Sequence, residues 1–265
     1  MLLDALDALG SHRDAAVVVG AHAVYMRAGD ADLAVAPHTT DGDLAIEPAA
    51  LGETPPLEQA FAHAGFRPRG GDSVGVWVTH RPTPANTTTE FAIDLLVPAS
   101  VSPGRGRRAA RLPGHDAHSA RIVRGLEGVI ADADIMGVGA LDASDGRRFD
   151  VRVAGSAALL VAKVHKIRDR SGTARSTDKD ALDVLRLLRG TTTDDLAVRM
   201  QRLLRDDDAR PVAEEALHLL GSQFANRAGE GTEMAVRAVG ALGEPAEISA
   251  SCEVLAGDLL RAMGR

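Results

Sequence analysis

The stretch TTDGDLAI at residues 39–46 decides the fold, because it joins a turn-like start to an apolar strand that carries two carboxylates. Asp41 and Asp43 are separated by one residue, and side chains with this spacing on a strand point to the same face. Two carboxylates held side by side repel each other, and a hard divalent cation such as Mg²⁺ commonly compensates for the repulsion. The alternative is a hairpin turn, since Asp and Gly are both common turn residues.

A third carboxylate interrupts another strand-like run. Asp94 lies in EFAIDLLVP at 90–98, which is otherwise mostly apolar. The preceding run VGVWVTH at 74–80 alternates as a strand, so we expect an antiparallel hairpin with Trp77 packed on the sheet. If the strand with Asp94 is adjacent to the strand with the other two carboxylates, the three groups form a two-metal site for phosphoryl or nucleotidyl transfer.

The residues before the carboxylate pair favour the metal-site interpretation over the turn. VVVGAHAVYMRAG at 17–29 is a β-branched run, a glycine, and then a helix-like amphipathic segment. A strand that leads through Gly20 into a helix N-terminus presents backbone N–H groups to a phosphate. His22 either donates to the same phosphate or packs as a surface residue.

The order of these features, Gly20 with its helix, then TxDxD, then the strand with Asp94, resembles the DNA polymerase β-like nucleotidyltransferase superfamily. More narrowly, it is similar to the AbiEii-type branch, many of whose members are toxins of type IV toxin–antitoxin pairs. VAKVHKIRDR at 161–170 and STDKDALDVLRLL at 176–188 resemble helical segments of that branch. The resemblance covers about the first 190 residues, and the remainder is only generically helical.

The resemblance implies an enzyme that moves a nucleoside monophosphate from a nucleoside triphosphate to a hydroxyl acceptor and releases pyrophosphate. It implies Mg²⁺, with Mn²⁺ as the substitute, bound by Asp41, Asp43 and Asp94. An RNA acceptor and an antitoxin protein are the partners that an AbiEii-type toxin would have. The residues assigned to the nucleotide and its phosphates are Gly20, Ala21, His22, Thr40, Lys163, Lys179 and Asp180.

Local explanations compete for the residues of the helical segments. Lys163 recurs with two further basic residues at spacings of three and four, so these cations either face a phosphate or form a solvent-facing stripe. Thr177 precedes a helix that starts near Lys179 and Asp180 and could cap it. Lys179 and Asp180 therefore bind nucleotide, orient Lys163, or belong to the helix start.

Two positions depart from the superfamily pattern and leave other functions open. Ala21 stands where relatives usually have a second glycine or a serine, and His38 stands where they often have an arginine. A neutral imidazole is a weaker phosphate clamp than a guanidinium. The alternatives are a transferase that acts on a small molecule, as antibiotic-modifying relatives do, and a non-catalytic protein that binds nucleotide or a partner on the same scaffold.

The composition limits how the protein could bind nucleic acid. A net charge of −7 and an aromatic content of 3% argue against a protein that coats nucleic acid or stacks on many bases. The segment 103–125 is nevertheless rich in arginine, and it either guides RNA or a triphosphate toward the carboxylates or is a solvated loop. Its arginines are Arg105, Arg107, Arg108, Arg111, Arg121 and Arg124.

The sequence favours a cytoplasmic protein. Cys252 is the only cysteine, which excludes a disulfide framework and suits a reducing compartment. There is no run of about 18 consecutive apolar residues. The N-terminus MLLDALDALGSHRD carries acidic residues where a signal peptide has basic ones. We therefore expect no membrane association.

Strand-like segments dominate the first half and helix-like segments the second, so we expect an α+β fold. We expect a nucleotidyltransferase-like mixed β-sheet with flanking helices, followed by a C-terminal helical bundle. The expected domains are a catalytic domain at 1–154 and a helical domain at 155–265 that contributes to the nucleotide and acceptor cleft. Asp132 and Asp134 repeat the DxD spacing in an expected strand at 129–138, but no glycine turn or helix precedes them, so we expect both at the surface.

Overall fold

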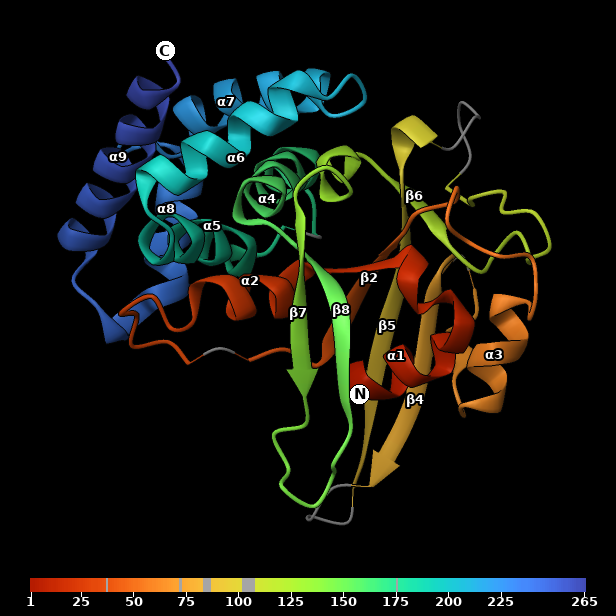
Figure 1. Ribbon diagram of the computed structural model, residues 1–265. Coiled ribbons are helices and arrows are strands. Elements are labelled where there is room, and N and C mark those ends of the chain that lie inside the picture. The colour runs from red at the N-terminus through yellow and green to blue at the C-terminus, as the bar shows by residue number, and fades with distance from the viewer. Residues whose placement is uncertain (37, 72, 83–86, 102–107, 175) are drawn as a thin grey trace. The chain divides into compact units, whose positions relative to one another are not determined.

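The chain forms two compact units in the computed structural model (Figure 1). The sheet unit consists of Met1–His22, Thr39–Val123 and Ala133–Ala154, and the helical unit consists of Ala23–His38, Arg124–Asp132 and Gly155–Arg265. The structure describes residues 1–36, 38–71, 73–82, 87–101, 108–174 and 176–265.

The sheet unit is built on one mixed sheet. The order of hydrogen-bonded strands is β3-β4-β5-β2-β1-β8-β7, and β6 pairs with β5. The pairs β1–β8, β2–β5 and β5–β6 are parallel, and the other pairs are antiparallel. The strands are β1 (Ala16–Val19), β2 (Asp41–Ile46), β3 (Arg67–Pro68), β4 (Val76–Pro82), β5 (Thr88–Pro98), β6 (Arg121–Val123), β7 (Ala133–Gly139) and β8 (Arg148–Ala154).

The expected hairpin forms from β4 and β5, which pair antiparallel. Trp77 on β4 is 2% exposed, and its ring lies 5.3 Å from the ring of Phe61, measured between centroids. The indole Nε1 donates to the carbonyl oxygen of Ser119 at 3.0 Å, so the one polar atom of this buried side chain has a partner. The prediction that Trp77 packs on the sheet is confirmed.

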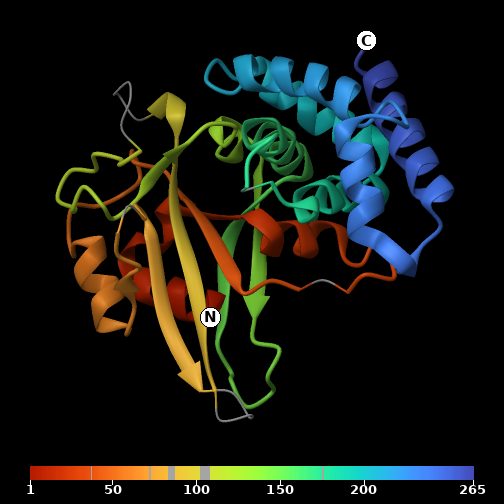
Figure 2. The same ribbon diagram turned by 180° about the vertical axis from the view of Figure 1, so that it is seen from behind.

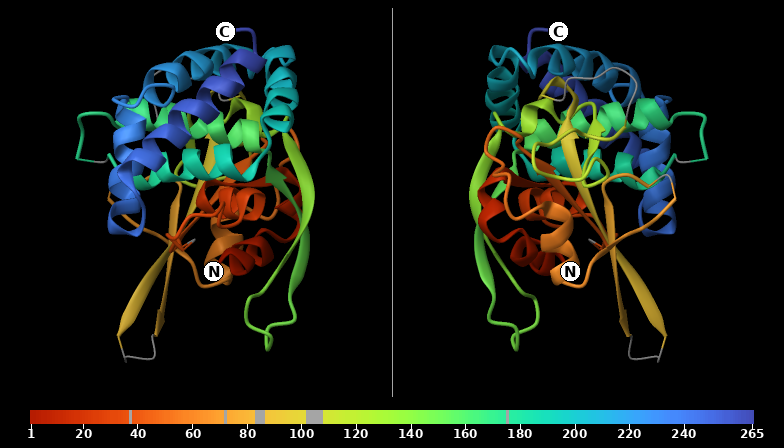
Figure 3. Two further views of the ribbon diagram at one scale, coloured as in Figure 1. Left: turned by 90° about the vertical axis from the view of Figure 1, so that its left-hand side faces the viewer. Right: turned by 90° about the vertical axis from the view of Figure 1, so that its right-hand side faces the viewer.

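Two helices cover one face of this sheet (Figure 3). They are α1 (Leu2–Leu9) and α3 (Leu57–His63), which lie side by side. α1 buries Leu2, Leu6 and Leu9, because leucines spaced three and four residues apart share one face of a helix. A sheet with one apolar face needs such a cover, and these short helices supply it.

The helical unit contains the predicted C-terminal helices (Figure 2). Within it α4 packs on α5, α6 and α7, and α8 packs on α5 and α9. In the described part of the chain, none of the helices is both long and apolar enough to cross a lipid bilayer. The helices are α2 (Gly20–Ala28, whose first three residues belong to the sheet unit), α4 (Ser156–Arg170), α5 (Asp178–Gly190), α6 (Thr193–Arg205), α7 (Arg210–Gln223), α8 (Glu230–Val239) and α9 (Pro245–Ala262). Short 3-10 turns occur at η1 (Gly10–Ala15), η2 (Ala99–Val101), η3 (Glu127–Val129) and η4 (Gly240–Leu242).

The α+β architecture with a helical C-terminal region is thus confirmed, but the surface position predicted for Asp132 is wrong. Asp132 is fully buried, and its Oδ2 accepts a hydrogen bond from the backbone N–H of Ala158 at 3.1 Å. Its Oδ1 accepts from Arg199 at 2.6 Å. The first N–H groups of a helix lack partners inside the helix and carry partial positive charge, so a carboxylate beside the start of α4 is stabilised there.

Candidate active site

Three carboxylates lie on one face of the sheet. β2 and β5 pair in parallel with Asp43 opposite Asp94 and Asp41 opposite Ala92. Residues opposite each other on adjacent strands share a face, and so do Asp41 and Asp43 at positions i and i+2. Asp41 is exposed, whereas Asp43 and Asp94 are half-buried. The strand register therefore brings together the three acidic residues that the sequence singled out.

Gly20 lies next to the carboxylates, at the end of β1. Val19, the last residue of β1, pairs with Asp43, and the chain then passes through Gly20 with a φ of +65° into α2. A Cβ atom on Gly20 would lie 2.0 Å from Oδ2 of Asp43, so the Asp43 carboxylate lies directly against this backbone. Glycine is required here both by the left-handed φ and by the contact.

The other residues predicted to contact phosphate flank this point. Ala21 is buried and His22 is half-buried in the first turn of α2. Thr40 is half-buried and directly precedes β2. The neighbouring Thr39 hydroxyl donates to the carbonyl oxygen of Asp41 at 3.1 Å and accepts from the Asp41 N–H at 3.2 Å, which fixes the start of the strand. Their roles toward a nucleotide stay predictions.

The electrostatics of the site reflect crowded negative charge. Burial, followed by the charge of Asp43, raises the pKa of Asp94 to about 6, although the guanidinium of Arg121 acts in the opposite direction. Arg121 forms a short ion pair with Oδ2 of Asp94. The sequence grouped Arg121 with the arginine-rich segment, but β6 places it beside β5. The signal in the sequence was the apolar pair Ile122 and Val123, which is too short to predict a strand by itself.

The three carboxylates are chemically suited to bind Mg²⁺, and they lie on the same face of the sheet. Carboxylate oxygens are ligands that this cation prefers, and three of them share one face of the sheet. Across the part of the chain that the structure describes, however, no group of three or more His, Cys, Asp or Glu side chains is close enough to hold a metal ion as it stands. One oxygen of Asp94 is taken by Arg121 instead. Metal binding by Asp41, Asp43 and Asp94 stays a prediction.

The predicted lysine of the helical unit lies in a buried ion-pair network. Nζ of Lys163 on α4 donates to Oδ1 of Asp180 at 2.9 Å and to Oδ2 of Asp183 at 2.6 Å, both on α5. Burial by itself would lower the pKa of Lys163, but the charges of Asp183 and Asp180 raise it. Burial would raise the pKa of Asp180, yet Lys163 and Lys166 lower it to about 2. Lys163 and Asp180 are therefore both charged at neutral pH.

This network orients Lys163 through Asp180 and Asp183. Thr177 caps α5, as its position in the sequence indicates, because its hydroxyl oxygen accepts from the Lys179 N–H. The side chain of Lys179 is half-buried. The phosphate contacts predicted for Lys163, Lys179 and Asp180 are separate from these structural contacts and stay predictions.

A second buried cation in the helical unit carried no signal in the sequence. Arg186 on α5 is 1% exposed, and its guanidinium lies 5.3 Å from the ring of Tyr25 and donates to the carbonyl oxygen of Val35. The Tyr25 hydroxyl donates to the carbonyl oxygen of His38 at 3.1 Å. The side chain of His38, which stands where relatives often have an arginine, is exposed.

The remaining arginines of the 103–125 segment differ in their surroundings. Arg105 and Arg107 lie outside the described residues. Arg108 and Arg111 are exposed, and Arg124 pairs with Glu215 at 2.5 Å within the helical unit. A role in guiding RNA stays a prediction for the exposed members.

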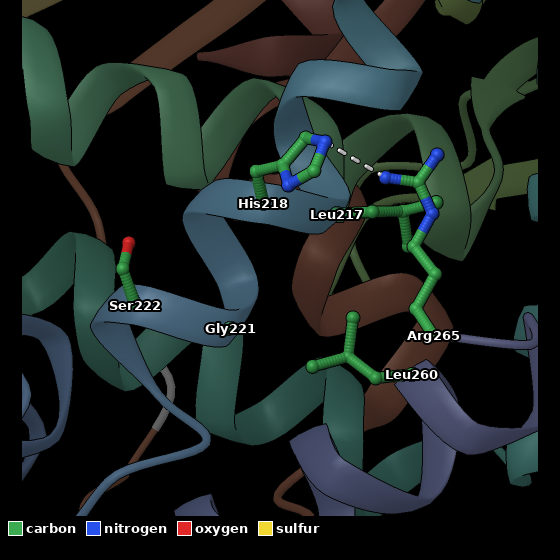
Figure 4. Close-up of a pocket in the computed structure, with 6 residues that line it drawn as sticks. All are labelled: Leu217, His218, Gly221, Ser222, Leu260 and Arg265. Atoms are coloured by element: carbon green, nitrogen blue, oxygen red, sulfur yellow. Dashed lines mark hydrogen bonds between the residues drawn. The ribbon is translucent and has the colours of Figure 1, made fainter.

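The helical unit also contains an open pocket of about 560 Å³ (Figure 4). In it Nε2 of His218 lies 3.0 Å from Nη1 of Arg265. The lining residues are Leu217, His218, Gly221, Ser222, Leu260 and Arg265. None of these side chains is a carboxylate, so the pocket does not offer the ligands that a Mg²⁺ site needs.

Substitution of Gly20 tests the packing of the site. Gly20→Ala places a methyl group in the space of the Asp43 carboxylate and imposes a left-handed φ on a residue with a Cβ. We expect a loss of about 2–4 kcal/mol in the free energy of unfolding, measured by urea titration. Gly10→Ala is the matched control, because Gly10 has a φ of +53° with nothing within 4 Å of its Cβ position. Equal losses in the two variants would contradict the close contact between Gly20 and Asp43.

Comparison with known proteins indicates the family of the chain. A family described as Nucleotidyltransferase matches residues 1–205. A search of curated proteins finds no match. Among solved structures, the chain is similar to an antigenic nucleotidyltransferase-like protein from Paracoccidioides brasiliensis, with 15% sequence identity and a TM-score of 0.42 over 82% of this chain and 91% of that one. Because the family match covers most of its length, the chain belongs to the nucleotidyltransferase family.

Proposed function

We propose that the protein is a Mg²⁺-dependent nucleotidyltransferase that moves a nucleoside monophosphate from a nucleoside triphosphate to a hydroxyl acceptor. The observation that supports this most is the parallel register that sets Asp43 opposite Asp94, with Asp41 on the same face. Nucleotidyl transfer needs grouped carboxylates near a site that binds phosphate, and the turn at Gly20, which lies against Asp43, supports the proposal that phosphate binds there.

In this proposal Asp41, Asp43 and Asp94 would hold the metal. Bound Mg²⁺ would neutralise the phosphates and lower the pKa of the acceptor hydroxyl. The backbone N–H groups that follow Gly20 would bind phosphate oxygens at the start of α2. The acceptor oxygen attacks the α-phosphorus, the bond to the bridging oxygen of the β-phosphate breaks, and pyrophosphate leaves with the electron pair. The proton of the hydroxyl passes to Asp94 or to water.

Two acceptor classes and one non-catalytic alternative follow from the sequence. RNA is our first choice, because the segments 161–170 and 176–188 resemble the AbiEii-type branch. An antitoxin protein would then be the natural partner. A small hydroxyl-bearing molecule is the second class, which the net charge of −7 favours. The third possibility is a non-catalytic nucleotide-binding protein. It is favoured by Ala21 and His38, which depart from the superfamily pattern. A contribution of residues 155–265 to the acceptor cleft is part of the proposal.

A labelled transfer assay separates these classes. The purified protein is incubated with each α-³²P nucleoside triphosphate in turn, with Mg²⁺, and with either total RNA or a panel of aminoglycosides. Label on RNA supports the first class, and label on an aminoglycoside supports the second. Triphosphate binding without release of pyrophosphate favours the non-catalytic alternative. Absence of both binding and transfer, with all four triphosphates and with Mn²⁺ in place of Mg²⁺, would contradict the proposal.

A further inference from the structure

We propose that Arg121 is a built-in counter-ion for Asp94 that a divalent cation has to displace. Arg121 would thereby weaken cation binding in the protein without nucleotide. This inference rests on the proposed function, because it takes Asp94 as a ligand of the metal. From the sequence, Arg121 belonged to an arginine-rich segment that either guides RNA or a triphosphate or is a solvated loop.

The backbone of Arg121 is fixed on two sides. On one side β6 pairs in parallel with β5, with Arg121 opposite Leu96. On the other side Ala109 forms an antiparallel bridge with Arg121, and the N–H of Ala110 donates to the carbonyl oxygen of Ala120 at 2.9 Å. A backbone held by both neighbours cannot move away from the site as a loop would.

The backbone of Gly75 also packs closely against the backbone of Arg121. A Cβ on Gly75 would lie 2.6 Å from the backbone nitrogen of Arg121, and Gly75 has a φ of +70°. The carbonyl oxygen of Gly75 accepts from the N–H of Leu95 at 2.8 Å, and its N–H donates to the carbonyl oxygen of His118 at 2.9 Å. Arg121 is therefore presented to Asp94 by backbone packing, and only its side chain is free to change partner.

The guanidinium balances the charge of the carboxylate group. It donates to Oδ2 of Asp94, while Asp43 lies opposite Asp94 in the strand register. The side chain of Arg121 is 28% exposed and that of Asp94 is 18% exposed. Because Arg121 reaches water, releasing it does not leave an unpaired buried cation, which would be costly.

Arg121 and a divalent cation compete for Asp94 because both are positively charged and both use the lone pairs of its carboxylate oxygens. An oxygen of Asp94 that accepts from a guanidinium has less electron density to offer a metal, and the positive charge repels an incoming cation. Once released, the planar guanidinium is suited to a phosphate, which it can bind with two parallel hydrogen bonds. Arg121 is thus a positioning residue that holds Asp94 before the substrates arrive.

Titration with Mn²⁺, followed by electron paramagnetic resonance without nucleotide, tests the proposal. Arg121→Gln is expected to bind Mn²⁺ about five- to tenfold more tightly than the natural protein. Arg121→Lys retains the charge and is expected to stay within about twofold of the natural protein. Arg69→Gln is the matched control, since Arg69 forms an exposed ion pair with Glu90 in the same unit. Asp94→Asn identifies the portion of the binding that belongs to this site.

The outcomes separate the inference from the function on which it rests. If Asp94→Asn abolishes Mn²⁺ binding but Arg121→Gln binds no more tightly than the natural protein, the counter-ion role is overturned and the metal site stands. If no Mn²⁺ binding depends on Asp94, the metal site itself fails and the inference falls with it. A ¹⁵N spectrum gives a second readout: the Nε–H signal that Arg121→Gln removes should shift when Mg²⁺ is added, and an unchanged signal with bound metal would overturn the proposal.

Discussion

Asp43→Asn is expected to reduce nucleotidyl transfer by about a thousandfold or more, since a metal ion supplies several kcal/mol of transition-state stabilisation. Asp43 is the central carboxylate, because it lies against Gly20 on one side and opposite Asp94 on the other. The measurement is the initial rate of label transfer from the nucleoside triphosphate that the assay above selects.

The same substitution is expected to leave the sheet unit at least as stable as before. Removing the charge of Asp43 relieves its repulsion of Asp94, and the amide has nearly the same shape as the carboxylate. Asp150→Asn on the exposed side of β8 is the control for a change of charge on the sheet. A variant that kept full turnover would remove Asp43 from the catalytic group, and a variant that lost both activity and stability would point to a structural role.

Lys163→Met is expected to cost about 3–5 kcal/mol in the free energy of unfolding, because it takes the cation from the buried Asp183 and one of the basic partners from the buried Asp180. Asp180 and Asp183 are 3% and 0% exposed, so water cannot replace the ammonium group without rearrangement. Urea unfolding at neutral pH measures the loss. Lys166→Met is the matched control, since Lys166 contacts the same Asp180 with a side chain that is 38% exposed, and we expect less than about 1 kcal/mol.

A triple variant distinguishes charge from packing. Lys163→Met combined with Asp180→Asn and Asp183→Asn removes all three charges, and it should recover much of the lost stability. A loss of under about 1 kcal/mol in Lys163→Met would contradict the importance of the network. The triple variant also tests the predicted phosphate contact, because a folded protein with unchanged affinity for the nucleoside triphosphate would show that Lys163 does not bind it.

Short-range patterns predicted the site's strands but not its surroundings. The DxD spacing and the apolar run around Asp94 are local features, so the sequence alone indicated that these carboxylates belong to strands. The register that sets Asp43 opposite Asp94 is a long-range property, and only the resemblance to known nucleotidyltransferases suggested it. Arg121 was missed as a partner of Asp94, because a strand of three residues has no periodicity to detect.

Lys163 and Asp132 both have partners that are distant in the sequence, and only the contact of Lys163 with Asp180 was among the alternatives that the sequence offered. Lys163 has the spacing of a surface stripe, but its acidic partners lie 17 and 20 residues further along the chain and bury it. Asp132 has the spacing of an exposed strand residue, but it meets the start of α4 and an arginine 67 residues away. Charge patterns along one element do not show which residues of another element will neutralise them.

Because Trp77 is buried in the sheet unit, its fluorescence can be used to follow that unit separately from the helical unit. The chain has one tryptophan and one tyrosine, and these chromophores fall in different units: Trp77 is in the sheet unit and Tyr25 is in the helical unit. Emission excited at a wavelength that only indole absorbs therefore reports the β4–β5 hairpin beside Asp94, whereas far-ultraviolet dichroism is dominated by the helices. The two signals follow the loosening of each half independently, without any attached dye.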